Sequence, residues 1–285
     1  MNHHSIPSFT RRGLDAGKIL AKKRSFYRVN NTIMILILSG TEEGKEIVRR
    51  LHKEGLSLLT TVATEYGKKM FEEIGLETVC LQGRLDAHGF SLLIKEKGID
   101  TVVDATHPYA IEVSQNAMDA CKKTNIRYLR FERQEIEIPE HPLIHKVKTM
   151  AESVDKSRTL GKKIFLATGI SSVAKFISLK DEKELYVRIL PIPEHIVLCL
   201  NMGIPPAHII AMHGPFSEDL NGAMFRQYQI NTVVTKDSGE VGGVLEKIHA
   251  ALKEGIDTIV IERPRLEFPQ KYSSIDEVVK TVKIQ

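Results

Sequence analysis

Four chemically versatile side chains lie close together in the stretch DATHPYA at residues 104–110. The imidazole of His107 and the phenol of Tyr109 can transfer protons, and Asp104 and Thr106 can form hydrogen bonds. The stretch directly follows the apolar run at residues 101–103, so it lies at the carboxyl end of a predicted strand, where parallel sheets bind ligands. We therefore predict a functional site here. A helix start capped by Asp104 and Thr106, with His107 half exposed, is the alternative.

A strand, a glycine-containing turn and a helix precede this stretch. The apolar run at residues 33–38 gives way to Ser39-Gly40-Thr41-Glu42, and an amphipathic helix follows. Such a turn presents backbone N–H groups and a helix N-terminus, which bind phosphate well, and glycine lets the phosphate approach the backbone. The turn carries Gly40 and Gly44 rather than a complete G-x-G-x-x-G pattern. From these residues alone, a phosphate site and a tight turn without a ligand both stay open.

Other predicted strands of the first half also end in polar residues. Thr64 follows the second strand, where a dinucleotide fold meets the adenosine ribose. Glu65 and Lys68 both occur there, so the sequence favours neither NADH nor NADPH. Arg84 follows the third strand and Arg133 the fifth, and each could hold an anion. Arg84 could equally be a solvent-exposed turn residue that binds no ligand.

The richest turn of the second half is Lys236-Asp237-Ser238-Gly239-Glu240. A cation, a hydroxyl group and flexible glycines ahead of a helix favour anion binding. A flexible helix start capped by Ser238 is the alternative. His213 and Arg263 also follow predicted strands. A single histidine in such a place is often a core residue whose hydrogen bonds are satisfied.

Positioning these residues requires two open parallel sheets. Strand patterns alternate with helical patterns in both halves of the chain, which predicts an α/β fold. We expect strands at residues 33–38, 58–63, 77–81, 101–104 and 126–131, and then at 163–167, 185–190, 208–212, 232–235 and 258–261. Periodicity is lost near residues 135–160, around Pro139 and Pro142. We therefore place one domain at residues 34–150 and a second at residues 151–285.

The composition argues against several classes of protein. Hydrophobic residues make up 42% and charged residues 27% of the chain, which is typical of a globular protein. The absence of tryptophan and the few aromatic residues disfavour a base-stacking nucleic-acid surface. No apolar run approaches the ~20 residues of a membrane span. Cys80, Cys121 and Cys199 are far apart, so we expect reduced core thiols of a cytoplasmic protein and no metal site.

The formal net charge of +4 comes from the N-terminal segment. The first 33 residues hold seven lysines and arginines against Asp15 alone, so the remainder is slightly acidic. We expect this segment to be a disordered basic extension. Because the first strand begins beside Met34, we favour that residue as the natural start over a functional basic arm.

These motifs resemble those of the precorrin-6A reductases. The stretch at residues 104–110 is similar to the Asp-Ala-Thr-His-Pro-Phe/Tyr-Ala signature of that family. Ser-Gly-Thr-x-Glu at residues 39–43 is similar to its Gly-Gly-Thr-x-Glu opening, with Ser39 in place of the first glycine. The Gly214-Pro215-Phe216 segment, the turn at residues 236–243 and Arg263-Pro264 fit its second domain. The resemblance extends from about residue 34 to the C-terminus.

The resemblance implies an oxidoreductase of cobalamin (vitamin B12) biosynthesis. Members of this family have two Rossmann-like domains, with cofactor and substrate in the cleft between them. They transfer a hydride from NADPH or NADH to the macrocycle of precorrin-6A or cobalt-precorrin-6A, which gives the corresponding precorrin-6B. The partner is thus a tetrapyrrole rich in carboxylates, with or without cobalt. We expect a monomer or weak oligomer that binds neither nucleic acid nor a membrane.

The residue patterns and the resemblance together give three sets of predicted site residues. The catalytic set is His107, Tyr109 and Asp104. The cofactor-binding set is Ser39, Gly40, Thr41, Glu42, Thr64, Thr106, Lys236 and Ser238. The substrate-binding set is Arg84, Pro108, Arg133, His213, Asp237, Gly239 and Arg263. The proton that completes the reduction could come from His107, from Tyr109 or from solvent.

Two functions of other classes stay open at this stage. A non-catalytic nucleotide-binding protein could close two such domains on a small ligand. A methyltransferase acting on tetrapyrroles could also pair two α/β domains. Oxidation of a nicotinamide cofactor in the presence of the tetrapyrrole would distinguish the reductase from both.

Overall fold

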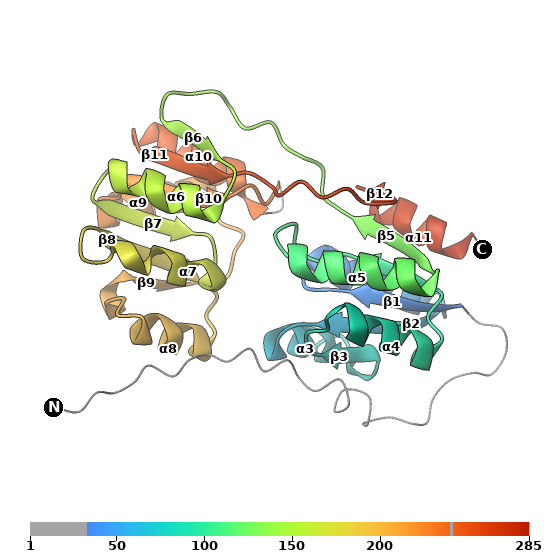
Figure 1. The fold of residues 1–285 in the computed structure, drawn as a ribbon. Helices are drawn as coiled ribbons and strands as arrows, with labels where there is room; N and C mark the ends of the chain where they lie inside the picture. Colours follow the sequence, from blue (N-terminus) through green and yellow to red (C-terminus); the bar gives the residue numbers. More distant parts are fainter. Residues whose placement is uncertain (1–32, 240–241, 285) are drawn as a thin grey trace. The chain divides into compact units, whose positions relative to one another are not determined.

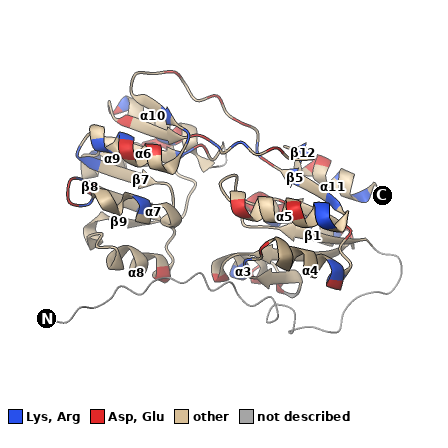
Figure 2. Ribbon diagram, viewed as in Figure 1, with Lys and Arg blue, Asp and Glu red and all other residues tan. Residues whose placement is uncertain are grey.

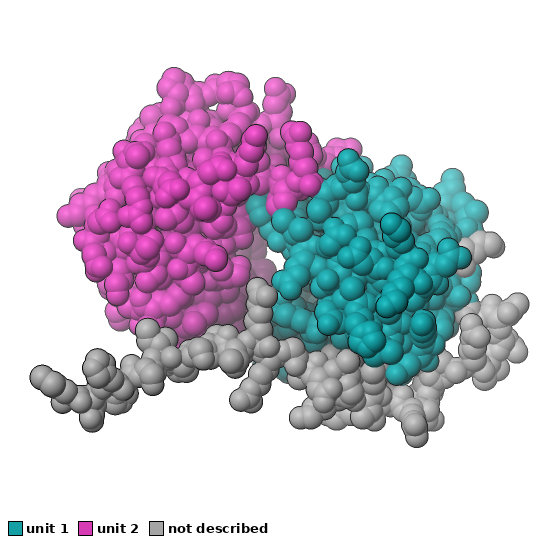
Figure 3. Space-filling model, in the orientation of Figure 1, with its two compact units in different colours: residues 1–133, 266–285 teal, residues 134–265 magenta. Residues whose placement is uncertain are grey.

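The computed structural model describes residues 33–239 and 242–284. The predicted basic extension at residues 1–33 lies outside the described residues, apart from Ile33. The chain divides into two compact units, which Figure 3 colours separately. Unit 1 contains the described residues up to Arg133 together with those from Leu266 onward, and unit 2 contains Gln134–Arg265. No described helix is both long and apolar enough to cross a membrane.

Unit 1 is built on a six-stranded parallel sheet. Across the sheet the order is β12 (Lys271–Tyr272), β5 (Arg127–Phe131), β4 (Thr101–Asp104), β1 (Met34–Leu38), β2 (Ser57–Val62) and β3 (Cys80–Gln82). All five residues of β1 are buried, because helices cover both faces of the sheet. Ile35 and Ile37 pack into one hydrophobic cluster, and Leu36 and Leu38 into another. This alternation confirms the predicted parallel α/β arrangement.

Helices cover the two faces of this sheet (Figure 1). Helices α2 (Glu42–Lys53), α3 (Glu65–Glu72) and α11 (Ile275–Lys283) pack on one face, and α4 (Ala87–Lys97) and α5 (Ile111–Thr124) pack on the other. Thr41, Thr64 and Asp86 cap three of them by accepting a hydrogen bond from a backbone N–H three residues later. In α5, Glu112 lies in the first turn and lysines lie in the last turn (Figure 2), which suits the helix dipole.

Unit 2 has a second six-stranded parallel sheet. Its order is β6 (Ile144–Val147), β11 (Asp257–Ile261), β10 (Thr232–Lys236), β7 (Lys163–Ala167), β8 (Glu184–Ile189) and β9 (Ile209–Ala211). Helices α9 (Glu218–Tyr228) and α10 (Val244–Lys253) pack together on one face. Helices α6 (Met150–Thr159) and α7 (Ile170–Phe176) lie over the other, and α8 (Pro193–Asn201) contacts α7. The sheet order and helix cover again confirm an open α/β fold.

The boundary between the units differs from the predicted one. The first crossing between units lies after Arg133 rather than near residue 150, because β6 already belongs to the second sheet. After Arg265 the chain returns to unit 1, where β12 pairs with β5 and α11 inserts Val278, Val279 and Val282 into the core. The short β12 gives no periodic signal, so the sequence pattern assigned this segment to the second domain.

One predicted strand is shorter in the structure. Residues Glu77–Val79 form a single turn of 3-10 helix, η1, and β3 begins only at Cys80. Two further 3-10 turns are present: η2 (Ile177–Leu179) extends α7, and η3 (Pro206–His208) precedes β9. The remaining predicted strands lie within one or two residues of their predicted bounds.

Candidate functional site

The sheet of unit 1 has a topological switch point between β1 and β4. From β1 the chain continues to β2 and β3 on one side, and then crosses to β4 and β5 on the other. Open α/β sheets bind ligands at the carboxyl ends of their strands beside such a point. The two motifs of the first half meet here, because the Thr41 hydroxyl donates a 2.9 Å hydrogen bond to the backbone carbonyl of Ala105.

The turn after β1 has an open side and a packed side. Gly40 has a φ of +151°, which L side chains rarely adopt, and no heavy atom lies within 4 Å of the place its Cβ would take. Gly44 instead lies against Ser39, so a Cβ there would be 2.6 Å from the Ser39 Oγ. Ser39 is buried, and its Oγ has no hydrogen-bond partner among the described residues. A ligand could therefore approach the backbone at Gly40, while the start of α2 covers Ser39.

Asp104 is the centre of a buried hydrogen-bond network. Its side chain is fully buried, and its two oxygens accept five hydrogen bonds. Oδ1 accepts from the backbone N–H of Thr106 (2.9 Å), the Thr106 hydroxyl (2.7 Å) and the Arg130 guanidinium (2.9 Å). Oδ2 accepts from the hydroxyls of Ser114 (2.6 Å) and Tyr128 (2.5 Å). These bonds fix the segment that leads from β4 to His107.

Sequence reasoning missed three members of this network: Ser114, Tyr128 and Arg130. Arg130 and Asp104 are register partners on neighbouring strands, and the Arg130 side chain is 1% exposed. The Arg130 guanidinium also lies 5.1 Å from the ring centroid of Phe268. Burial, followed by the Asp104 charge and its hydrogen bond, raises the pKa of Tyr128, so its phenol stays protonated and donates to Asp104. The signal available in the sequence was a charged residue inside an otherwise apolar strand.

His107 and Tyr109 lie side by side after β4. Both are half-buried, and their ring centroids are 5.5 Å apart. The backbone N–H of Tyr109 donates a 3.3 Å hydrogen bond to Nδ1 of His107. In the neutral ring this acceptor role leaves the proton on Nε2. The structure therefore holds the His107 imidazole in one orientation, from which Nε2 could donate a proton.

Arg133 is held by Glu43 in the first turn of α2. Nη2 of Arg133 donates to Oε2 of Glu43 (2.7 Å) and Nε donates to Oε1, so the pair is bidentate. Burial raises the pKa of Glu43, but the hydrogen bonds and charge of Arg133 outweigh it and leave this pKa below its usual value. The pair therefore adds stability above the usual glutamate pKa, and the contribution is lost as pH falls through the lowered value.

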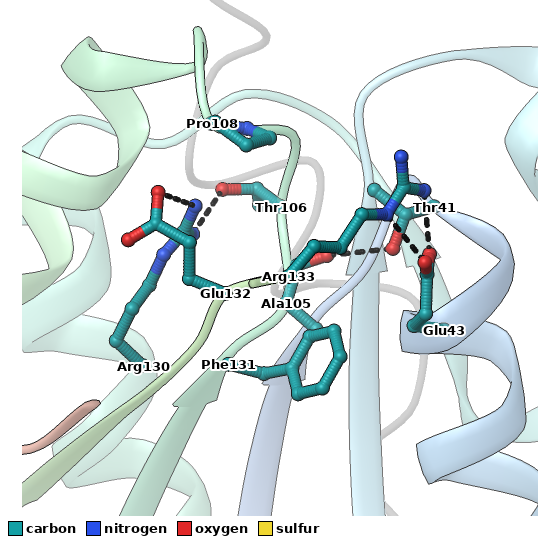
Figure 4. A pocket seen from close by; sticks show the side chains of 9 residues that line it. All are labelled: Thr41, Glu43, Ala105, Thr106, Pro108, Arg130, Phe131, Glu132 and Arg133. Carbon is teal, nitrogen blue, oxygen red and sulfur yellow. Dashed lines mark hydrogen bonds and ion pairs between the residues drawn. The ribbon is translucent and has the colours of Figure 1, made fainter. Parts of the chain in front are cut away.

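A small pocket lies between these groups (Figure 4). Its lining includes Thr41, Glu43, Thr106, Pro108 and Arg133, together with Ala105, Arg130, Phe131 and Glu132. Its volume is about 10 Å³, which is about enough for one water molecule. A dinucleotide cannot be enclosed by it. The predicted residues Thr64 and Arg84 follow β2 and β3 on the carboxyl edge of the sheet, and both are exposed.

The predicted residues of unit 2 lie along the carboxyl edge of its own sheet. Asp237 is paired with Arg263, whose Nε lies 3.4 Å from Oδ2 and donates to the Asp237 carbonyl at 3.2 Å. Asp237 Oδ1 also accepts from the backbone N–H of Gly239, which has a φ of +74°. Burial lowers the pKa of Lys236. His213 follows the edge strand β9 and is exposed.

Among residues 33–239 and 242–284, no three acidic, histidine or cysteine side chains come together as a potential metal site. The three cysteines are free and buried, and burial raises the pKa of Cys80 to about 11 and of Cys121 to about 12. These thiols are therefore protonated at neutral pH and act as apolar core residues.

A comparison with protein families matches residues 34–283 to the family described as precorrin-6x reductase CbiJ/CobK. The chain belongs to this family. A cobalt-precorrin-6A reductase of Methanocaldococcus jannaschii is 37% identical over 249 residues, which cover 87% of this chain and 97% of the relative. A cobalt-precorrin-6A reductase of Salmonella typhimurium is 34% identical over 231 residues, which cover 81% of this chain and 87% of the relative.

A solved structure supports the same fold. The structure of CobK precorrin-6A reductase superposes with a TM-score of 0.71 and 23% identity, and the match covers 88% of this chain and 96% of the other. As a precorrin-6x reductase, the protein is an oxidoreductase, which favours that function over the non-catalytic and methyltransferase alternatives. Both motifs that suggested the family meet at the switch point of unit 1.

Proposed function

We propose that this precorrin-6x reductase transfers a hydride from a nicotinamide dinucleotide to the macrocycle of cobalt-precorrin-6A, giving cobalt-precorrin-6B in cobalamin biosynthesis. The observation that carries the proposal is the family match over residues 34–283. The cobalt-bearing substrate is favoured because relatives named cobalt-precorrin-6A reductase are 37% and 34% identical, whereas the solved precorrin-6A reductase is 23% identical.

The residues at the switch point fit a dinucleotide. The backbone at Gly40 is open, and the turn leads into the N-terminus of the twelve-residue helix α2. Backbone N–H groups and the positive end of the helix dipole favour a pyrophosphate there. We assign this contact to Gly40, Thr41 and Glu42. When bound, the nicotinamide supplies the hydride, and the protein supplies position and electrostatics.

We assign His107 as the proton donor and Asp104 as a positioning residue. Asp104 already accepts five hydrogen bonds inside unit 1, so it has no role in proton exchange with a ligand. It holds Thr106, and with it the start of the segment that presents His107. Nε2 of His107 can then give a proton to the carbon beside the one that accepts the hydride. Tyr109 orients His107 through its backbone N–H.

Of the remaining predicted residues, the cations are proposed to bind the carboxylates of the macrocycle or, for Lys236, a phosphate of the cofactor. Arg84 is exposed on the edge of unit 1, and Arg133 lies beside the small pocket. Lys236, Asp237, Ser238 and Gly239, with Arg263 and His213, line the edge of unit 2. Cations and N–H donors at these places suit a substrate rich in carboxylates.

An anaerobic assay tests the proposed reaction. Cobalt-precorrin-6A and metal-free precorrin-6A are each supplied with NADH or NADPH, and the absorbance of the nicotinamide is followed. We expect cofactor oxidation with the cobalt form at a higher kcat/KM than with the metal-free form. Absence of oxidation with all four combinations would contradict the proposed function, and a preference for the metal-free form would overturn the assignment of substrate.

Substitution of Gly40 by valine should weaken dinucleotide binding. A side chain at this place would project into the open space that we assign to the pyrophosphate, so we expect the Kd for the preferred nicotinamide cofactor to rise by about tenfold or more. Calorimetric titration measures the change. Gly55→Val is the matched control, because Gly55 also has a positive φ (+75°) and open space at its Cβ but lies after α2, away from this turn. Equal affinities in the two variants would exclude the turn as the pyrophosphate site.

A further inference from the structure

Unit 2 contains two buried cations that the proposed reaction does not use. Arg188 is the penultimate residue of β8, and Lys247 lies one turn into α10. Arg188 is 8% exposed and Lys247 is 5% exposed. Both places are near the carboxyl edge of the sheet, beside the N-termini of α9 and α10.

The contacts of Arg188 among the described residues involve neutral groups. Its Nη1 donates a 2.7 Å hydrogen bond to Oδ1 of Asn221, and its guanidinium lies 4.1 Å from the ring centroid of Phe216 and 5.3 Å from that of Phe165. Asn221 is fully buried and donates to the carbonyls of Phe216 and Ser217, so its oxygen is fixed toward Arg188. The guanidinium is thereby held in place, with further N–H donors left for a ligand.

The hydrogen-bond partner of Lys247 is also a neutral group. Its ammonium group donates a 2.9 Å hydrogen bond to the carbonyl of Gly242, and it makes no ion pair within the part of the chain that the structure describes. Burial and the charge of Arg188 lower the pKa of Lys247 to about 7, against the opposite effect of Glu246. Phe216 lies beside both groups: its ring centroid is 4.1 Å from the Arg188 guanidinium, and its carbonyl oxygen is 4.0 Å from the place a Cβ of Gly243, one turn before Lys247, would take.

The first unit provides an internal comparison. Arg130 is also a penultimate strand residue and is also buried, but Asp104 lies 2.9 Å away as its counter-ion. The side-chain partner of Arg188 is instead the neutral amide of Asn221, which accepts its hydrogen bond but carries no charge. A buried cation is costly when no carboxylate is bonded to it, and among the described residues Glu246, whose buried Oε2 has no hydrogen-bond partner, makes no ion pair with Lys247. The free energy of this arrangement falls when an anion binds between them.

We propose that Arg188 and Lys247 form an oxyanion site in unit 2 that binds a carboxylate or phosphate group of a ligand. Asn221 is the positioning residue, because it orients the guanidinium without adding charge. The N-terminus of α10 adds a favourable dipole for the same anion. If the proposed reaction is correct, the anion is either a carboxylate of the tetrapyrrole or a phosphate of the nicotinamide cofactor.

Calorimetry and thermal unfolding with simple anions test the site without relying on turnover. Inorganic phosphate and citrate are titrated at constant ionic strength below pH 7, where Lys247 carries its proton. We expect both anions to bind the wild-type protein and to raise its Tm by about 2–5 °C. Lys247→Met should raise the Kd by about 10–100-fold, which is the loss expected for one charge-assisted contact. Its Tm without anion should equal or exceed that of the wild type, because the uncompensated charge is gone.

Lys253→Met is the matched control. Lys253 lies on the same helix but is exposed and paired with Glu218, so its replacement should leave anion binding unchanged. Lys247→Gln provides a second variant if Lys247→Met does not fold. Absence of binding to the wild type, or wild-type affinity in the Lys247 variants, would overturn the proposal. So would binding that is seen only after Glu246→Gln, because the Glu246 carboxylate would then be the counter-ion.

The steady-state constants identify the source of the anion. A Lys247→Met enzyme with a raised KM for the tetrapyrrole alone indicates a substrate carboxylate, and a raised KM for the nicotinamide alone indicates a cofactor phosphate. Anion binding without turnover in the wild type would leave this site intact and contradict the proposed reaction instead. The two inferences can therefore fail separately.

Discussion

The Asp104→Asn protein should have a free energy of unfolding about 3–5 kcal/mol lower than that of the wild type, because the substitution leaves the buried Arg130 cation with only Glu132, 4.0 Å away, as a counter-ion. An asparagine of the same shape offers one oxygen and one NH₂ group to five hydrogen-bond donors, so at least one donor faces another donor. Denaturation with urea measures the loss.

Two further variants test whether the loss of stability comes from the broken Asp104–Arg130 ion pair or from replacing any aspartate by asparagine. Asp119→Asn on the exposed side of α5 should change the free energy of unfolding by less than about 0.5 kcal/mol. Combining Asp104→Asn with Arg130→Met removes the cation as well, so the double variant should be more stable than the sum of the two single losses predicts. Strict additivity would show that the buried pair is not coupled.

The largest expected effect on turnover is that of His107→Ala. If Nε2 of His107 gives the proton that completes the reduction, its removal should lower kcat by about 10²–10⁴-fold. The Kd for the nicotinamide cofactor should stay unchanged, because the open turn at Gly40 is retained. Single-turnover kinetics and cofactor titration measure the two quantities separately.

His107→Asn distinguishes proton transfer from orientation. The asparagine oxygen can accept the hydrogen bond from the Tyr109 backbone, as Nδ1 does, but it offers no ionisable proton. This variant should therefore be as slow as His107→Ala if the imidazole donates a proton. His88→Ala, at an exposed histidine of α4, is the matched control and should keep the wild-type kcat. A wild-type kcat in His107→Ala would exclude His107 and leave Tyr109 or solvent as the source of the proton.

The strands were predictable because each one is short, apolar and followed by a glycine or polar turn. β1, β4 and β7 lie at or within one residue of their predicted bounds. The return of the chain to unit 1 was not predictable, since β12 has two residues and its partner β5 is distant in sequence. Local periodicity carries no information about which sheet a short edge strand joins.

The position of the candidate site at the strand ends could be predicted from the sequence, but most of the side-chain contacts within it could not. The strand ends indicated the carboxyl edges, and Thr41 and Ala105 do meet there. The side chains that hold Asp104 come from α5 and β5, so no spacing rule connects them with DATHPYA. Arg130 and Arg188 share one recognisable feature, a cation near the end of an apolar strand, which calls for a counter-ion in any fold.

The late return of the chain to unit 1 has a consequence for the order of events on the ribosome. When residues 33–133 have emerged, β5 is still an open edge, and the cluster around Ile47 and Val48 lacks Val278, Val279 and Val282. Unit 2, by contrast, is continuous from Gln134 to Arg265 and has its whole core as soon as that segment is made. Domains usually fold in the order of their synthesis. Here the unit that begins first completes its core last, with the second already synthesised in between.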